Sequence, residues 1–197
     1  MLQPELDIVQ KWITPGSRVL DLGCGDGMLL QSLGSSHQIE GYGLEIDPER
    51  ITACIAKGVN VIETDINKGL AHFPDKSFET VLMTNSLQAL MRPDRTIEEM
   101  LRIGRECVVT FPNFGNIRAR TYLGVKGQMP VTKQLSYQWY DTPNIHFCTV
   151  KDFETLCLEK NISIIHRATV SSHAIDRQLM GIWPNLFAET AIYHLSK

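Results

Sequence analysis

Short apolar runs rich in Val, Ile, Leu and Thr alternate along this chain with segments whose apolar residues recur at helical spacing. Apolar runs of this length are typical of strands that are buried in a parallel sheet. Five such strands are predicted, at residues 19–22, 39–45, 59–64, 78–84 and 107–111. Helices are predicted at residues 6–13, 27–33, 49–57 and 95–103. This alternation predicts right-handed βαβ crossovers and a Rossmann-like, doubly wound, mostly parallel α/β sheet.

The carboxyl-terminal part continues the pattern after a long interruption. It predicts a helix at 150–159 and two strands at 163–170 and 189–195. We expect these two strands to close a seven-stranded sheet as an antiparallel edge. The 197 residues suit one domain, 1–197, large enough to bury a substantial core.

The first predicted strand leads into a turn with glycine at every second position: Gly23, Gly25 and Gly27. Glycine is used where the backbone needs φ > 0 or where a ligand lies directly on it. A strand, a glycine turn and a helix form nucleotide sites at the carboxyl ends of parallel strands. The dinucleotide fingerprint G-x-G-x-x-G is not met, because Met28 stands where its third glycine belongs.

Acidic residues at this turn indicate which ligand it suits. Asp21 precedes the turn and Asp26 lies within it. Two carboxylates would repel a pyrophosphate at the helix N-terminus. They favour a ligand with an ammonium and a sulfonium, such as S-adenosylmethionine (SAM), while a tight turn without a ligand is the alternative. Cys24 is also a candidate residue of this cofactor site, although its small side chain equally suits a purely structural role in the turn.

The ends of the next two strands supply further candidates. Glu45 follows the glycines by roughly 20 residues, where a carboxylate grips a ribose through its hydroxyls. Asp47 is predicted to be the N-cap of the following helix. Asp65 ends the third strand and could bind the adenine amino group, or it could be a simple turn residue. Ile46 and Ile66, which follow these acids, complete this part of the predicted site.

The interruption at residues 112–149 is much longer than the roughly 4–6 residues of an ordinary connection, which is typical of functional loops. Its charged residues are mostly basic, and its aromatic residues are Phe114, Tyr122, Tyr137, Trp139, Tyr140 and Phe147. This composition predicts an insertion that acts as a lid or an interface. The alternatives are a loop packed on its own aromatic side chains and an RNA-binding segment.

Composition narrows the class of protein. The formal net charge of −3 disfavours nucleic acid and anionic membranes as partners. Membrane spans and a signal peptide are not expected, because the sequence shows no sufficiently long apolar run and no leader-like start. Five scattered cysteines without a C-x-x-C pair favour reduced thiols in a cytoplasmic protein, with no metal site.

Several motifs resemble a known family. Asp-Leu-Gly-Cys-Gly-Asp-Gly, ending at residue 27, resembles motif I of the class I SAM-dependent methyltransferases. More specific strings are similar to the methionine-biosynthesis MetW family over residues 2–170. They are Ser-Leu-Gln-Ala-Leu at 86–90, Thr-Phe-Pro-Asn-Phe-Gly at 110–115, Gly-Gln-Met-Pro at 127–130 and Trp-Tyr-Asp-Thr-Pro-Asn-Ile-His at 139–146.

The resemblance implies a bacterial cytoplasmic protein of methionine synthesis with the class I methyltransferase fold. It implies SAM or S-adenosylhomocysteine as cofactor and a homoserine O-acyltransferase of the MetX type as partner. It also places Asn85 beside the cofactor, although Thr84-Asn85 departs from the usual family pattern.

Catalysis is less well supported than binding. Amino-group methyltransferases often carry an N-P-P-F/Y tetrad after the fourth strand, whereas here that strand ends Met-Thr-Asn-Ser at residue 86. His146 could line the pocket or belong to an edge strand that leads to a helix capped near Thr149. Three functions therefore stay open: a SAM-binding accessory protein of the acyltransferase, a methyltransferase acting on a small metabolite or protein side chain, and a structural relic of the fold.

Overall fold

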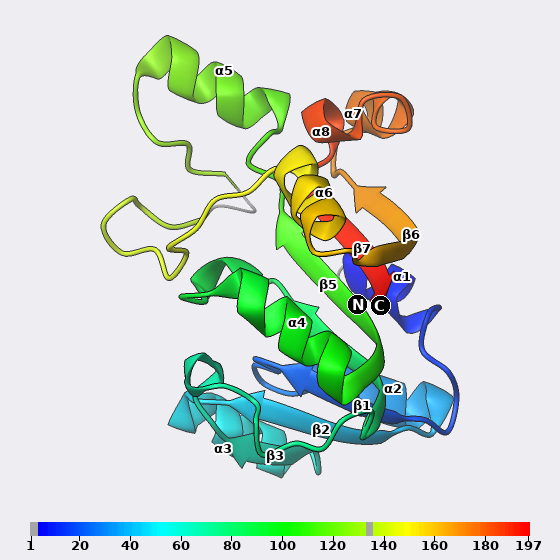
Figure 1. The fold of residues 1–197 in the computed structure, drawn as a ribbon. Helices are drawn as coiled ribbons and strands as arrows, with labels where there is room; N and C mark the ends of the chain where they lie inside the picture. Colours follow the sequence, from blue (N-terminus) through cyan, green and yellow to red (C-terminus); the bar gives the residue numbers. More distant parts are fainter. Residues whose placement is uncertain (1–3, 133–135) are drawn as a thin grey trace.

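The computed structural model describes residues 4–132 and 136–197, which form one seven-stranded sheet in the order β3-β2-β1-β4-β5-β7-β6 (Figure 1). The strands are β1 Arg18–Leu22, β2 Glu40–Glu45, β3 Asn60–Glu63, β4 Phe78–Thr84, β5 Gly104–Pro112, β6 Ser163–Val170 and β7 Thr190–Ser196. Strands β1 to β5 pair in parallel, and β7 runs antiparallel between β5 and β6. The predicted doubly wound, mostly parallel sheet with an antiparallel end is confirmed.

Helices cover both faces of this sheet. The α-helices of the described residues are α1 Pro4–Gln10, α2 Met28–His37, α3 Pro48–Ala56, α4 Pro93–Ile103, α5 Ile117–Lys126, α6 Val150–Glu159, α7 Ala174–Leu179 and α8 Pro184–Phe187. Two short 3₁₀ helices are η1 Ile66–Lys68 and η2 Leu87–Ala89. Among the residues described, no helix is both long enough and apolar enough to cross a membrane.

Alternation along the strands divides the core into two layers. Leu20 and Leu22 of β1 pack with α4 and α6 on one face, whereas Val19 packs with α1 and α2 on the other. Tyr193 and Ile192 of β7 divide in the same way. Successive side chains of a strand point to opposite faces, so each apolar run contributes side chains to both core layers. This is why the strand pattern was continuous rather than alternating.

The helices beyond the parallel core differ most from the sequence-based expectation. Helix α5 lies inside the interruption 112–149, and α7 and α8 fill the connection between β6 and β7. Of the α5 residues only Ala119 is buried, so the helix has no clear apolar stripe. The sequence marks this helix by the residues at its two ends instead. The Asn116 side chain accepts a hydrogen bond from Arg118 N, and Gly127 ends the helix in the left-handed conformation.

Strand β2 approaches the glycine turn closely at Gly43. A Cβ built on Gly43 would lie 2.9 Å from Cys24 Cβ and 3.3 Å from Leu30 Cδ1, and closer still to Cys24 Sγ. Real Cβ atoms do not tolerate such contacts, so only glycine fits here. The tight fit sets the distance between β2 and the turn that follows β1.

Replacing Gly43 with alanine should therefore destabilise the protein by about 1–3 kcal/mol, because the new methyl overpacks a rigid site. Gly34→Ala is the matched control, since the Cβ position at Gly34 in α2 is open. Alanine there should leave stability unchanged or raise it by about 0.5–1 kcal/mol through helix propensity. Urea unfolding of both variants measures the difference, and equal effects would contradict this account of the packing.

Candidate functional site

The glycine turn adopts left-handed backbone at each of its glycines. The φ angles of Gly23, Gly25 and Gly27 are 74°, 59° and 75°. Gly23 N and Cys24 N both donate hydrogen bonds to Leu44 O, at 2.9 and 3.0 Å. The turn after β1 is therefore held against the last residues of β2.

The three glycines meet different surroundings. A Cβ at Gly27 would lie 2.9 Å from Cys54 Sγ, and one at Gly23 would lie 3.2 Å from Ser86 Oγ. At Gly25 no described heavy atom lies within 4 Å of that position. Packing therefore explains two of the glycines, whereas the space beside Gly25 is open to a ligand.

The Cys24 side chain belongs to the core rather than to this open space. Its Sγ lies 3.9 Å from Cys54 Sγ, and Cys54 Sγ donates to Gly25 O at 3.2 Å. Burial raises the pKa of the Cys24 thiol far above its ordinary value. A part for Cys24 in cofactor binding stays a prediction.

Glu45, the predicted ribose-binding acid, lies directly against the turn. Its side chain is 6% exposed, and Oε2 accepts a hydrogen bond from Gly25 N at 2.9 Å. Oε1 accepts from Ile46 N at 2.8 Å and from Asp47 N at 3.1 Å. Three backbone donors thus fix the orientation of this carboxylate.

Asp21, at the end of β1, is the second buried acid near the turn beside Glu45, and it is 1% exposed. Among the described residues its Oδ1 has no hydrogen-bond partner. Burial, and then the nearby charge of Glu45, raise the pKa of Asp21 to about 7. A buried carboxyl without a partner is costly in its ionised form, so this position is suited to an added cationic or donor group.

Asp26 corrects one part of the sequence-based argument. Lys57 Nζ forms an ion pair with its carboxylate and donates to Asp26 O at 2.8 Å. The hydrogen bond from Lys57 Nζ to the Asp26 carboxylate lowers the pKa of Asp26 below its ordinary value. Asp26 is therefore neutralised within the protein, and Glu45 Oε2 lies 3.9 Å from Arg50 Nη1. Asp21 is the acid of the site that has no ion-pair partner among the described residues.

The end of β3 lies beside the end of β2, because Thr64 N donates to Glu45 O at 3.0 Å. Asp65 caps η1: its Oδ1 accepts from Asn67 N at 3.0 Å and from Asn67 Nδ2 at 3.2 Å. This is the turn role considered as the alternative, and an adenine contact stays a prediction. Ile46 is 57% exposed at this edge, whereas Ile66 is half-buried against the core.

Asn85 lies at the end of β4 on the same edge of the sheet. It is exposed, with φ of 56°, and its N–H donates to Thr110 O and Thr110 Oγ1, both at 3.1 Å. The next residue, Ser86, donates through Oγ to Leu22 O at 3.0 Å. Sequence reasoning missed Ser86 as the link between β4 and the glycine turn, because only its place in a family motif marked it.

His146 does not belong to an edge strand, and its side chain is exposed. Its Nε2 lies 3.3 Å from Met91 O. The predicted helix cap after it is present, since Thr149 and Asp152 form a capping box at the start of α6. His146 is thus bonded to the segment after β4 rather than placed over the glycine turn.

The aromatic residues of the interruption divide into two groups. Phe114 and Phe147 are in contact in a tilted arrangement, with ring centroids 4.7 Å apart. Trp139 and Tyr140 are 74% and 71% exposed. The loop therefore packs partly on its own aromatic side chains and presents the others to solvent.

The raised pKa of Asp21 predicts a pH-dependent stability. Between about pH 4 and pH 7 the folded state keeps a proton that the unfolded state has lost, so stability falls as pH rises through this window. Asp21→Asn should therefore be more stable than the wild type at pH 8, by roughly 2–4 kcal/mol, and similar to it near pH 4.

Denaturant unfolding at the two pH values checks this, with Asp26→Asn as control. Asp26 has a lowered pKa and a lysine partner, so its loss should not stabilise the protein at pH 8. A wild type more stable than Asp21→Asn at pH 8 would contradict the assigned environment of Asp21.

Solved structures with similar architecture include SAM-dependent methyltransferases. A possible histamine N-methyltransferase from Thermotoga maritima is 18% identical, with a TM-score of 0.67 over 98% of this chain and 87% of that one. A SAM-dependent methyltransferase from Archaeoglobus fulgidus is 18% identical, with a TM-score of 0.65 over 98% and 94%. At this identity the likeness shows the fold alone: this chain has the class I methyltransferase α/β fold.

Sequence comparison gives the family. The bifunctional methionine biosynthesis protein MetXA/MetW of Rhodopirellula baltica is 33% identical over 189 residues, which cover 91% of this chain and 30% of the relative. The chain thus spans less than a third of that relative's length. Residues 3–195 match the family described as Methionine biosynthesis protein MetW. The chain belongs to the MetW family of methionine biosynthesis proteins.

Proposed function

We propose that this chain is a SAM-binding accessory protein that supports the homoserine O-acyltransferase (MetX-type) step of methionine biosynthesis. The observation that carries the binding part is the unpartnered carboxyl of Asp21, buried at the base of a turn that is open beside Gly25. The partner is supported by the family and by the relative that joins MetXA and MetW in one chain.

The chemistry of the site fits an adenosyl sulfonium. Asp21 supplies negative charge where a cationic ligand would be stabilised, and ligand binding would compensate for the cost of ionising it. Glu45 would accept from the ribose hydroxyls with the acceptor capacity that its three backbone donors leave open. The backbone of Gly23, Cys24 and Gly27 would lie along the ligand.

The adenine would lie at the neighbouring strand ends. Ile46 presents an exposed apolar side chain there, and Asp65 and Ile66 follow β3. Asn85 follows β4, which is separated from β3 by β1 and β2, at the same carboxyl-terminal end of the parallel strands. Each of these contacts is part of the proposal.

Binding without methyl transfer is the preferred form of this function. The segment after β4 lacks the N-P-P-F/Y tetrad, and His146 is bonded to Met91 O. A methyltransferase acting on a small metabolite or protein side chain is the alternative, favoured by the fold of the solved relatives.

Homoserine acyl transfer by a MetX-type enzyme should rise severalfold when this chain and SAM are added. S-adenosylhomocysteine should support the reaction as well as SAM does, because binding alone is proposed and this compound has no methyl group to transfer. The assay compares acyl transfer by the enzyme alone, with the chain, and with the chain plus each ligand. Support by SAM only would favour methyl transfer, and unchanged rates throughout would refute the accessory role.

Gly25→Arg should abolish binding of both ligands in titration calorimetry, because its side chain would fill the space beside the turn. Gly16→Arg is the matched control: Gly16 also has positive φ (72°) and an open Cβ position, but it precedes β1 at the opposite end of the strand. This variant should bind like the wild type. Equal loss in both variants would attribute the effect to backbone strain rather than to the site.

A further inference from the structure

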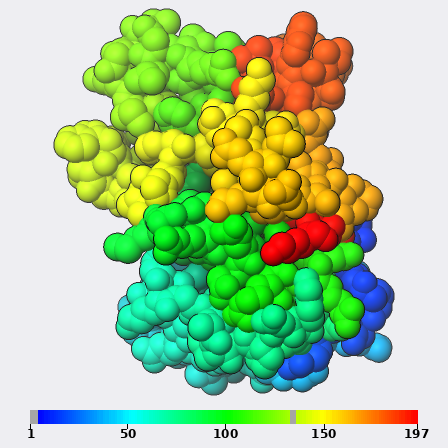
Figure 2. Space-filling model, viewed as in Figure 1, coloured from blue at the N-terminus to red at the C-terminus, as the bar shows by residue number. Residues whose placement is uncertain are grey.

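An exposed aromatic segment projects from one side of the molecule. We call residues 137–148 the strap; it is the yellow-green to yellow region that protrudes below α5 in Figure 2. Trp139 and Tyr140 of the strap are in edge-to-face contact, with ring centroids 5.7 Å apart. Both side chains are more than two-thirds exposed.

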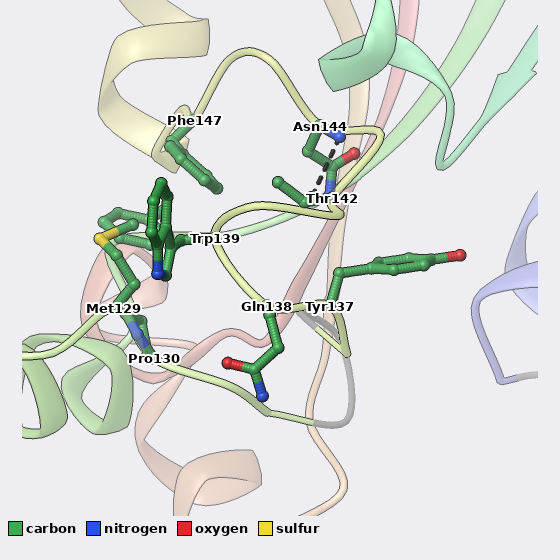
Figure 3. A pocket seen from close by; sticks show the side chains of 9 residues that line it. Met129, Pro130, Tyr137, Gln138, Trp139, Thr142, Asn144 and Phe147 are labelled. Carbon is green, nitrogen blue, oxygen red and sulfur yellow. Dashed lines mark hydrogen bonds between the residues drawn. The ribbon is translucent and has the colours of Figure 1, made fainter.

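The strap is shaped as well as exposed. Figure 3 shows the side chains of Trp139, Phe147, Met129 and Pro130 gathered on one side, around a small hollow, while Tyr137 points away from them. On the other side of the loop Asn144 N donates to Thr142 Oγ1 at 3.1 Å. Tryptophan and tyrosine beside an apolar hollow are the residue types that dominate binding energy at protein interfaces.

The strap is fastened to the segment that follows β4. Gln88 O accepts hydrogen bonds from both Ile145 N and His146 N, at 2.9 and 3.0 Å. His146 Nε2 lies 3.3 Å from Met91 O. Gln88 itself is 2% exposed, and its Nε2 donates to Pro112 O at 3.1 Å. Gln88, the anchor of the strap, is therefore itself part of the buried interior.

From this anchor, hydrogen bonds lead to the proposed adenine side of the cofactor site. Met91 N donates to Asn67 Oδ1 at 2.9 Å, and Asn67 Nδ2 donates to Asp65 Oδ1 at 3.2 Å. The Asn67 side chain thus joins the strap anchor to Asp65. A ligand amino group bound at Asp65 would act on the same carboxylate that holds Asn67.

We propose that the strap is the docking element for the MetX-type acyltransferase, and that an adenosyl ligand strengthens this docking through Asn67. The proposal rests on the proposed function for its ligand and its partner. Ligand binding fixes Asp65 and Asn67, and therefore fixes Met91 and the strap held to it. Docking then loses less conformational entropy, because ligand binding has already ordered the strap before the partner binds. Because such coupling is reciprocal, the acyltransferase should tighten ligand binding by the same factor.

The first arm of the test locates the surface. Trp139→Ala should weaken binding to the acyltransferase about tenfold or more, as expected for a central aromatic contact, and leave SAM binding to the isolated chain unchanged. Trp183→Ala is the matched control, because Trp183 is 58% exposed at the N-cap of α8, away from the strap. Loss of partner binding in Trp183→Ala but not in Trp139→Ala would overturn the proposal and favour the α7–α8 face.

The second arm tests the coupling. SAM should tighten partner binding by the wild type about fivefold to tenfold. Asn67→Ala should bind the partner and SAM separately within about twofold of the wild type, yet lose this gain. Asn60→Ala, which removes an exposed asparagine of β3 bonded to Gly41 O, should keep it. A gain that persists in Asn67→Ala would refute the route through Asn67.

Failure of the proposed function is distinguishable from failure of this inference. If the wild-type chain does not bind the acyltransferase at all, the partner assignment is wrong and the docking proposal falls with it. If the wild type binds and Trp139→Ala binds equally well, the partner stands and only the docking surface is refuted. Light scattering or titration calorimetry of the full chains gives both results.

Discussion

The candidate site depends on the hydrogen bonds that join the glycine turn to the end of β2. Leu44 O receives two N–H groups from the turn, and the Glu45 carboxylate receives the N–H of Gly25. These bonds fix left-handed backbone that only glycine adopts at little cost. Without them the turn would have no fixed position relative to the strand that supplies the carboxylate.

This arrangement also decides how charge is distributed. Asp26 is matched by Lys57, but Asp21 lies in the interior without a partner among the described residues. The protein thus neutralises the exposed acid and leaves the buried one unmatched. Leaving a buried carboxyl unmatched costs stability, and positions of this kind occur preferentially where a ligand is bound.

Much of the fold could be predicted from the sequence because it is encoded locally. Apolar runs mark the strands, and Asp47 and Pro48 mark the start of α3, where the predicted N-cap is confirmed. The glycine spacing likewise marks the turn. The neutralisation of Asp26 could not be predicted, because Lys57 is 31 residues away and only the packing of α3 brings it close. Helix α5 was missed because its residues are mostly exposed and lack the periodicity on which helix prediction depends.

The place of β7 in the sheet has a consequence for biosynthesis. Among the described residues, β6 pairs with no strand other than β7, which itself lies next to β5. While the ribosome is still making residues 171–196, β6 has no neighbouring strand to pair with. The amino-terminal half can assemble early. The β5-β7-β6 end of the sheet can form only after β7 has left the exit tunnel and has paired with both β5 and β6. A stop codon before residue 190 would therefore release a chain with β6 unpaired, and such an open edge is a target for proteases and aggregation.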